Sequence, residues 1–427
     1  MNLNLIPIWV SFLIAIVIIL LLSQIGLKDL GTALFAGAIF LAFMSIFPYR
    51  VNLGEVSALV FLSPKNIFLA LSVMVIPLLG GIMNKSGLMM ELIHRLDVSN
   101  KWGLMLSPGL FGLLPMPGGA LLSAPLVENI DPNLAPHKKV AINVWFRHVL
   151  ILIYPLQGSI LVVTDIVGFS NPYITSGVLL IPFVVMVTIG FLYFILTTPK
   201  IERKNTRNLC IFLRDVFPIL LAPIIDIIGR IVLSQLEKNS IPAPEWIVPE
   251  MFLFIGLIIS VAFSFLLSKH AKSEEVIQVH SNEILGIAKK MKVWRYPIMI
   301  FGMFFFLEVF VRSGMPEFIS ALNAPMVLFL FISFLMGVGT GRVQLPASIL
   351  FPIYMTQHVI TVMPFFQFGL IYFAVFLGYL ITPIHPCLAY SIDYFKTTYT
   401  KSFRNLVIPS LIGLAVVYAV FGVSLLF

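Results

Sequence analysis

Long apolar stretches recur along the whole chain, and most are long enough to cross a lipid bilayer. About 20 apolar residues cross the roughly 30 Å of bilayer hydrocarbon. Of the 427 residues, 59% are hydrophobic and 11% are charged, whereas a soluble domain carries about 25% charged residues. The sequence therefore predicts an all-α polytopic membrane protein. With two cysteines in the whole chain, a disulfide-stabilised secreted fold is excluded.

Ten of these stretches are predicted to be membrane-crossing helices. In chain order they are Pro7–Leu22, Leu30–Phe47, Ile67–Met83, Val140–Val163, Tyr173–Leu196, Ile211–Leu236, Met251–Leu267, Tyr296–Val311, Phe365–Tyr394 and Leu406–Phe427.

Two further apolar segments, at about 102–128 and 325–356, are interrupted by proline and glycine. Pro115–Gly119 reads PMPGG, and Gly339–Gly341 reads GTG. Proline lacks a backbone donor and glycine favours non-helical conformations, so neither sequence continues a helix. Non-helical backbone at membrane depth is tolerated only where protein buries it or where it lines a wet cavity. We therefore predict two re-entrant hairpins.

The loop charges support this topology. If the ten helices alternate in direction and the hairpins do not cross, 19 loop Lys and Arg residues lie on one side of the membrane. The other side holds Arg50, Lys65, Lys238 and Arg312. Basic loops are enriched in the cytoplasm, so both termini are predicted to lie on the non-cytoplasmic side. The net charge of +8 is attributed to these loops, and no nucleic-acid partner is expected.

The interruptions recur at a nearly constant spacing. Gly119 and Gly341, at the hairpin tips, lie 222 residues apart, and Pro155 and Pro383, in the helices that follow, lie 228 apart. A fixed spacing of this kind indicates an internal repeat. We predict two inverted five-helix repeats, residues 1–200 and 201–427, with interrupted helices at about 140–163 and 365–394. Paired interrupted segments in inverted halves are typical of secondary transporters, whose site lies between the repeats.

Charged and titratable residues near the interruptions are the candidate site residues. Arg342 follows the second tip, and an intramembrane Arg usually faces a cavity or a partner. The forked donors of its planar guanidinium suit an oxyanion. A structural ion pair is the alternative. His148 and His385 lie in the interrupted helices and are candidates for substrate contact or proton coupling, against hydrogen-bonded packing. Asp393 is the acid placed for ion coupling. Arg147 is expected to extend toward the membrane surface.

Intramembrane acids are scarce. Asp226–Arg230 and Glu308–Arg312 are spaced four apart, so each is predicted to form a structural pair on one helix face. The interrupted segments carry more cations than anions, which favours an anionic substrate. No Walker loop, HExxH, GxSxG or paired CxxC sequence is present, so we expect no enzyme and no ATP-driven pump.

The motifs GLLPMPGGALLSAP (Gly112–Pro125) and ITPIHPCLAY (Ile381–Tyr390), together with the two halves, resemble the ion transporter superfamily. That group contains divalent-anion/sodium symporters, arsenite and sodium/proton antiporters and gluconate permeases. The chain looks most like a prokaryotic branch labelled as a domain of unknown function. The resemblance implies an inner-membrane protein, a homodimer and an elevator mechanism. It implies that the hairpin tips and interrupted helices hold the substrate, through Pro117, Gly118, Gly119, Tyr154, Gly339, Thr340, Gly341, Arg342, Gln344 and His385. His148 joins these expected substrate contacts because of its place in the first interrupted helix.

The sequence thus favours secondary transport of a small organic or inorganic anion, coupled to H⁺ or Na⁺. His385 and Asp393 are the expected ion-coupling residues. The expected partners are the anionic substrate, the lipid bilayer and a second copy of the chain. No cofactor is expected beyond Na⁺ as a coupling ion, and no resident metal is assigned. The alternative is a monovalent cation/proton antiporter with a membrane acid such as Asp393 as its proton carrier.

Overall fold

The computed structural model of the chain describes most of its length. The described residues are 7–25, 30–45, 51–96, 100–113, 119–196, 209–240, 242, 244–270, 276–321 and 324–425. Within them the secondary structure is helical, and no strand is present. The predicted all-α fold is therefore confirmed.

The first half of the chain folds into helices that are mostly shorter than a bilayer crossing. They are α1 (Ile8–Ile25), α2 (Leu30–Met44), α3 (Leu53–Phe61), α4 (Pro64–Lys85), α5 (Leu88–Leu96), α6 (Asn100–Gly112), α7 (Gly119–Ile130), α8 (Pro136–Ile151), α9 (Gly158–Ile166), α10 (Pro172–Val178) and α11 (Leu180–Gly190), which continues into the π-helical turn η1 (Phe191–Ile195).

The second half contains the longer helices. They are α12 (Leu209–Lys238), α13 (Pro249–His270), α14 (Ser281–Met291), α15 (Arg295–Arg312), α16 (Met315–Ser320), α17 (Met326–Thr340), α18 (Gln344–Gln357), α19 (Phe365–Ile381), α20 (Pro386–Tyr394) and α21 (Tyr399–Ser424). Helices α3, α14 and α16 lie outside the predicted spans and hairpins: α3 precedes the third predicted span, α14 lies in the polar segment before Tyr296, and α16 precedes the second hairpin.

Five helical segments among the described residues are long and apolar enough to cross a membrane. They are Pro64–Lys85, Cys210–Lys238, Pro249–Lys269, Phe365–Tyr394 and Tyr399–Ser424. The bent pairs α10 with α11 and α14 with α15 raise the number to seven if each pair is one span, and α1, α2 and α17 are shorter apolar helices. The protein is a multi-pass membrane protein, whereas the full count of ten spans stays a prediction.

The helix breaks fall where proline and glycine predicted them. The first hairpin segment divides into α6 and α7, and the second into α17 and α18. The helix after each hairpin also divides, into α8 and α9 around Pro155 and into α19 and α20 around Pro383. Proline removes one backbone donor and clashes with the preceding turn, which explains both divisions. Each half thus contains a divided hairpin segment followed by a divided helix, and the inverted relation of the two halves stays a prediction.

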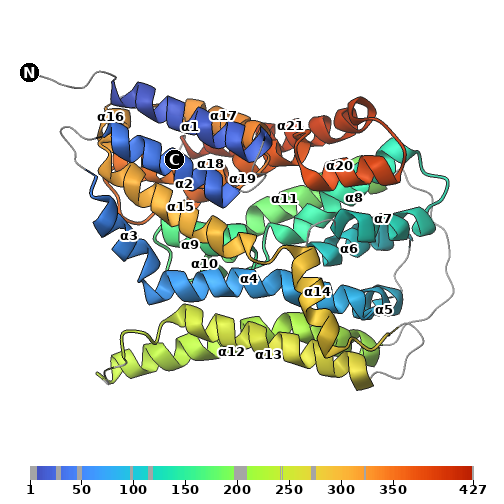
Figure 1. Cartoon of the computed structure of the whole chain (residues 1–427). Coiled ribbons are helices and arrows are strands. Elements are labelled where there is room, and N and C mark those ends of the chain that lie inside the picture. The colour runs from blue at the N-terminus through green and yellow to red at the C-terminus, as the bar shows by residue number, and fades with distance from the viewer. Residues whose placement is uncertain are drawn as a thin grey trace, which may run out of the picture.

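Six helices form one continuous packed row. In spatial order they are α1, α2, α15, α4, α13 and α12, and each contacts the next. Figure 1 shows the row running from α12 and α13 at the bottom edge to α1 at the top. At the crossing of α2 and α15 the backbones at Gly31 and Gly302 are so close that either glycine would clash if it carried a Cβ. Small residues permit such close helix packing in membranes.

The broken helices pack mainly on one another and form a second group beside the row. Within this group α6 contacts α7 and α8, α20 contacts α7 and α8, and α17 packs tightly on α19, which also contacts α21. Gly337 and Gly378 mark the crossing of α17 and α19, where a Cβ on either residue would overlap the facing backbone. The row and the broken-helix group meet through fewer contacts, such as that between α15 and α18.

The predicted intrahelical ion pairs are confirmed. Arg230 Nε lies 3.0 Å from an Asp226 carboxylate oxygen, and Arg312 Nε lies 3.3 Å from Glu308. Each pair extends to another helix: the Tyr173 hydroxyl donates to Asp226 at 2.8 Å, and Arg312 bonds Glu55 at 2.9 Å. Both arginines are therefore neutralised by acids away from the broken-helix group.

The predicted orientation can be tested by cysteine labelling. In a background with both native cysteines replaced by Ser, Lys238→Cys should react with an impermeant maleimide added to intact cells. Lys396→Cys should react only after the membrane is permeabilised, because the positive-inside bias places it in the cytoplasm. Both lysines are exposed, so accessibility depends on the side of the membrane. Labelling of Lys396→Cys in intact cells would contradict the predicted topology.

Candidate functional site

The last turns of α8 and the start of α20 meet inside the broken-helix group and carry the titratable residues that the sequence analysis singled out. Helix α19 ends at Ile381, and Pro383 prevents its continuation. Pro386 is the first residue of α20, a position where its missing N–H costs nothing. His385 is thus the N-cap of α20 and lies in the gap between two helices. His148 lies on α8 one turn before that helix ends.

The two histidines contact each other in the interior of the protein. Their ring centroids are 4.6 Å apart with the planes nearly perpendicular, and both residues are 0% exposed. Because a carbonyl only accepts, His148 Nδ1 must donate to the Val144 carbonyl at 2.6 Å. This leaves His148 Nε2 as the acceptor, 3.2 Å from the Tyr379 hydroxyl. The Tyr379 ring packs on His385 with centroids 4.3 Å apart.

His385 lacks the hydrogen bonds that a buried histidine normally makes. Neither Nδ1 nor Nε2 makes a hydrogen bond of normal geometry within the part of the chain that the structure describes, although the ring interacts with the Leu380 backbone. The nearby Thr382 hydroxyl is also buried and unpaired there. Buried polar groups are rarely left unsatisfied, because each costs about 1–3 kcal/mol. The break between α19 and α20 therefore presents groups suited to a ligand.

Arg147 lies beside the histidines and is buried, which corrects the expectation that it extends toward the membrane surface. Its exposed fraction is 2%, and its Nε and Nη1 have no partner among the described residues. The guanidinium packs against Gly119 at the start of α7, where any Cβ would overlap it. The residue next to His148 in sequence thus lies against the tip of the first hairpin.

Asn143 joins the first hairpin to the second interrupted helix. Its Nδ2 donates to the Ala120 carbonyl of α7 and to the Ser391 hydroxyl of α20, both at 2.9 Å. Its Oδ1 accepts from the Ser123 hydroxyl at 2.6 Å. Asn143 is fully buried. These three bonds hold α7, α8 and α20 together, one turn of α8 away from Arg147 and His148.

The second hairpin tip packs against the same break. Gly341 has φ of +63°, a left-handed conformation that favours glycine, and a Cβ there would meet Ile384 and Thr382. The Thr340 hydroxyl donates to the Met336 carbonyl at 2.7 Å, and the Arg342 amide donates back to that hydroxyl at 3.4 Å. The Arg342 side chain is partly buried, and its charge, like that of Arg147, acts on the Tyr379 hydroxyl.

The structure therefore gathers Gly119, His148, Gly341, Arg342 and His385 around the α19–α20 break, with Thr340 at the edge of the second tip. Gly339 faces open space, and Gln344, at the start of α18, is partly buried. Pro117 and Gly118 lie outside the described residues.

Two expected site residues lie elsewhere. The Tyr154 hydroxyl donates to the Ile219 carbonyl of α12 at 3.4 Å, so Tyr154 connects the α8–α9 break to the packed row. Asp393 is exposed and lies eight residues along α20 from His385, about 12 Å at the helical rise of 1.5 Å per residue. Neither side chain joins the histidine pair.

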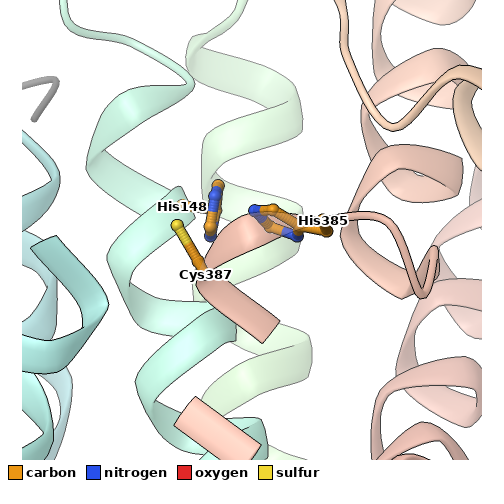
Figure 2. A group of neighbouring side chains, drawn as sticks. All are labelled: His148, His385 and Cys387. Carbon is orange, nitrogen blue, oxygen red and sulfur yellow. The ribbon is translucent and has the colours of Figure 1, made fainter. Parts of the chain in front are cut away.

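Three residues of this region were not among the sequence candidates: Asn143, Tyr379 and Cys387. The Cys387 sulfur and a ring nitrogen from each histidine all lie within 4.8 Å of one another. Figure 2 shows the three side chains pointing toward one another, His148 from α8 and the other two from the start of α20. A polar Asn in an apolar helix is the one signal that could have identified Asn143, because intramembrane polar residues usually make interhelical bonds.

Comparison with known proteins places the chain in a family. No curated protein matches the sequence. Among solved structures, the YdaH transporter of Alcanivorax borkumensis, described as having an unusual topology, is similar at 13% identity with a TM-score of 0.47, covering 85% of this chain and 86% of that one. The family described as protein of unknown function (DUF401) matches residues 8–424. The chain belongs to the DUF401 family.

Proposed function

We propose that this protein is a secondary active transporter of a small organic or inorganic anion, coupled to an H⁺ or Na⁺ gradient, and not an enzyme. The observation that carries the proposal is the buried Arg147 guanidinium, which has two nitrogens without a partner in the described structure. Burying an unpaired charge costs several kcal/mol. An anion that enters between the hairpin tips and the α19–α20 break would supply the missing partner.

The surroundings of Arg147 favour an anion over a cation. The charges of Arg147 and Arg342 both act on Tyr379, and the unpaired His385 and Thr382 adjoin the same break. The ion-paired intramembrane acids Asp215, Asp226 and Glu308 are each held by an arginine elsewhere. An arginine guanidinium is well suited to a carboxylate or oxyanion, because one guanidinium can form two parallel hydrogen bonds with it.

The packing is compatible with an elevator mechanism in an inner-membrane homodimer, as the resemblance to the ion transporter superfamily implies. The expected scaffold helices are the first two or three spans of each half, and in this proposal they correspond to members of the packed row, which consists of α1, α2, α4, α12, α13 and α15. The hairpins and the interrupted helices contact mainly one another. In the proposed cycle the broken-helix group moves as one body and carries the anion past the row. Both termini lie on the non-cytoplasmic side in this proposal.

The alternative, a monovalent cation/proton antiporter, needs an acid as its proton carrier. Asp393 is exposed and lies away from the histidine pair, so the arrangement favours the anion transporter. Thermal unfolding of the purified protein in panels of anions and cations distinguishes the two. An anion at 100 times its Kd stabilises the folded state by about 2.7 kcal/mol. Stabilisation by cations alone would contradict the anion proposal.

Arg342→Lys tests the role of the second tip. Lysine keeps the charge but not the planar fork, so we expect a folded protein whose anion affinity falls at least about tenfold, the effect of losing one charge-assisted bond of 1.5–3 kcal/mol. The anion-dependent shift in melting temperature measures this affinity. A folded Arg342→Ala protein with wild-type anion affinity would instead make Arg342 a structural residue.

A further inference from the structure

We propose that His148, His385 and Cys387 form a binding site for a borderline-soft transition-metal ion, with Zn²⁺ as the representative. This site lies beside the anion position and stands independently of the transport proposal. Its three donor atoms come from two helices of the broken-helix group and lie within 4.8 Å of one another. Figure 2 shows the three side chains next to one another, with His148 between Cys387 and His385 in this view.

The hydrogen bonds of His148 match those of a metal ligand. Ligating histidines almost always donate the second ring N–H to a carbonyl or carboxylate, which fixes the tautomer and the ring orientation. His148 Nδ1 donates to the Val144 carbonyl at 2.6 Å, so Nε2 carries the lone pair, which accepts from the Tyr379 hydroxyl in this structure. On metal binding Nε2 would exchange its 3.2 Å contact with the Tyr379 hydroxyl for a bond to the ion.

His385 supplies the independent indication of a ligand. It is completely buried, and neither ring nitrogen makes a hydrogen bond of normal geometry among the described residues, although the ring interacts with the Leu380 backbone. Cys387, two residues later on the first turn of α20, places its sulfur on the same side. A buried imidazole beside a second imidazole and a thiol thus brings three potential metal ligands within 4.8 Å of one another.

The donor set selects the class of ion. Two imidazoles and one thiolate suit Zn²⁺, Co²⁺ or Cu⁺, whereas Na⁺, Mg²⁺ and Ca²⁺ require oxygen ligands. Zinc bonds of about 2.0–2.3 Å place tetrahedral ligands roughly 3.5 Å apart. The donor separations of up to 4.8 Å must therefore shorten by about 1 Å, within reach of small side-chain rotations.

The charge around the site determines its fourth ligand. Arg147 acts electrostatically on both histidines, so a bare divalent ion there is repelled. The Cys387 thiolate offsets one positive charge. Three protein ligands leave one position of a tetrahedral ion open. A small anion held by Arg147 would occupy this position and offset a second positive charge.

Cobalt titration of the full-length protein in detergent tests this site. After chelator treatment and desalting, the protein should bind one Co²⁺ per chain and show a thiolate-to-cobalt charge-transfer band, which Zn²⁺ abolishes by displacement. Cys387→Ser should lose the band and weaken zinc binding by at least about tenfold. Cys210→Ser is the matched control, because Cys210 is exposed on α12, and it should keep the band.

Two further variants separate loss of a ligand from loss of folding. Cys387→His keeps three ligands, so it should retain zinc but lose the charge-transfer band. His385→Gln should lose cobalt binding, while His358→Gln, in which the replaced histidine stacks on Tyr354, should not. Absence of the band in the folded wild-type protein, or an unchanged band in Cys387→Ser, would overturn the proposal. Metal binding is read directly from the cobalt band and involves no transport measurement, so failure of the transport proposal leaves this result unaffected.

Discussion

Arg147→Met is expected to abolish anion binding while leaving the protein at least as stable as the wild type. Methionine fills most of the volume of the arginine stem and needs no partner, so it removes the cost of a buried charge that no described acid neutralises. Losing a charged partner of a buried anion costs about 2–5 kcal/mol, or at least about 30-fold in affinity. Melting temperatures with and without anions measure both effects.

Arg404→Met is the matched control. Arg404 is exposed on α21, so its replacement should leave the anion-dependent shift unchanged. Removing one partner of a buried ion pair lowers the free energy of unfolding by about 3–5 kcal/mol. If Arg147→Met lowers the melting temperature of the anion-free protein by a correspondingly large amount, Arg147 has a structural acid partner. That result would remove the main support for the anion site.

Asn143→Leu should produce the largest loss of stability among substitutions near the site. Leucine is similar in size but makes none of the three bonds to Ala120, Ser123 and Ser391. The Ala120 carbonyl then loses its side-chain donor in the interior. We expect the free energy of unfolding to fall by about 2–4 kcal/mol, because each buried polar group left without a hydrogen bond costs about 1–3 kcal/mol. Thermal unfolding in detergent measures this change.

The comparison for this prediction is Asn405→Leu. Asn405 is partly exposed on α21, and among the described residues its side chain donates to the Lys401 carbonyl of its own helix, so the change should stay within about 0.5 kcal/mol. Equal effects of the two substitutions would show that the Asn143 bonds do not hold α7, α8 and α20 together.

The helix pattern could be predicted from the sequence because proline and glycine act locally. Pro155 and Pro383 predicted the divisions between α8 and α9 and between α19 and α20, which the structure confirms. Helix α3 was missed because it is short and directly precedes the next predicted span. Helix α14 was missed because its sequence is polar and apolar run length was the criterion for a helix.

The site could be predicted only in part, because its residues meet through tertiary packing. His148 and His385 were identified from their places in interrupted helices, and the structure brings their rings into contact. Cys387 and Asn143 were missed because their partners lie in the other half of the chain: Asn143 and Ser391 are 248 residues apart. Burial of Arg147 could not be anticipated either, since it depends on the missing side chain of Gly119, around which the guanidinium packs.

Electrical measurement of transport tests the central proposal most directly. Proteoliposomes adsorbed on a solid-supported membrane are exposed to jumps in the concentration of carboxylates and inorganic oxyanions, with H⁺ and Na⁺ gradients imposed separately. Wild-type protein should give a transient current for at least one anion under one of these gradients, and Arg147→Met should give none. Equal anion-evoked currents in the two proteins, or currents evoked in wild-type protein by cations alone, would contradict a buried anion site at Arg147.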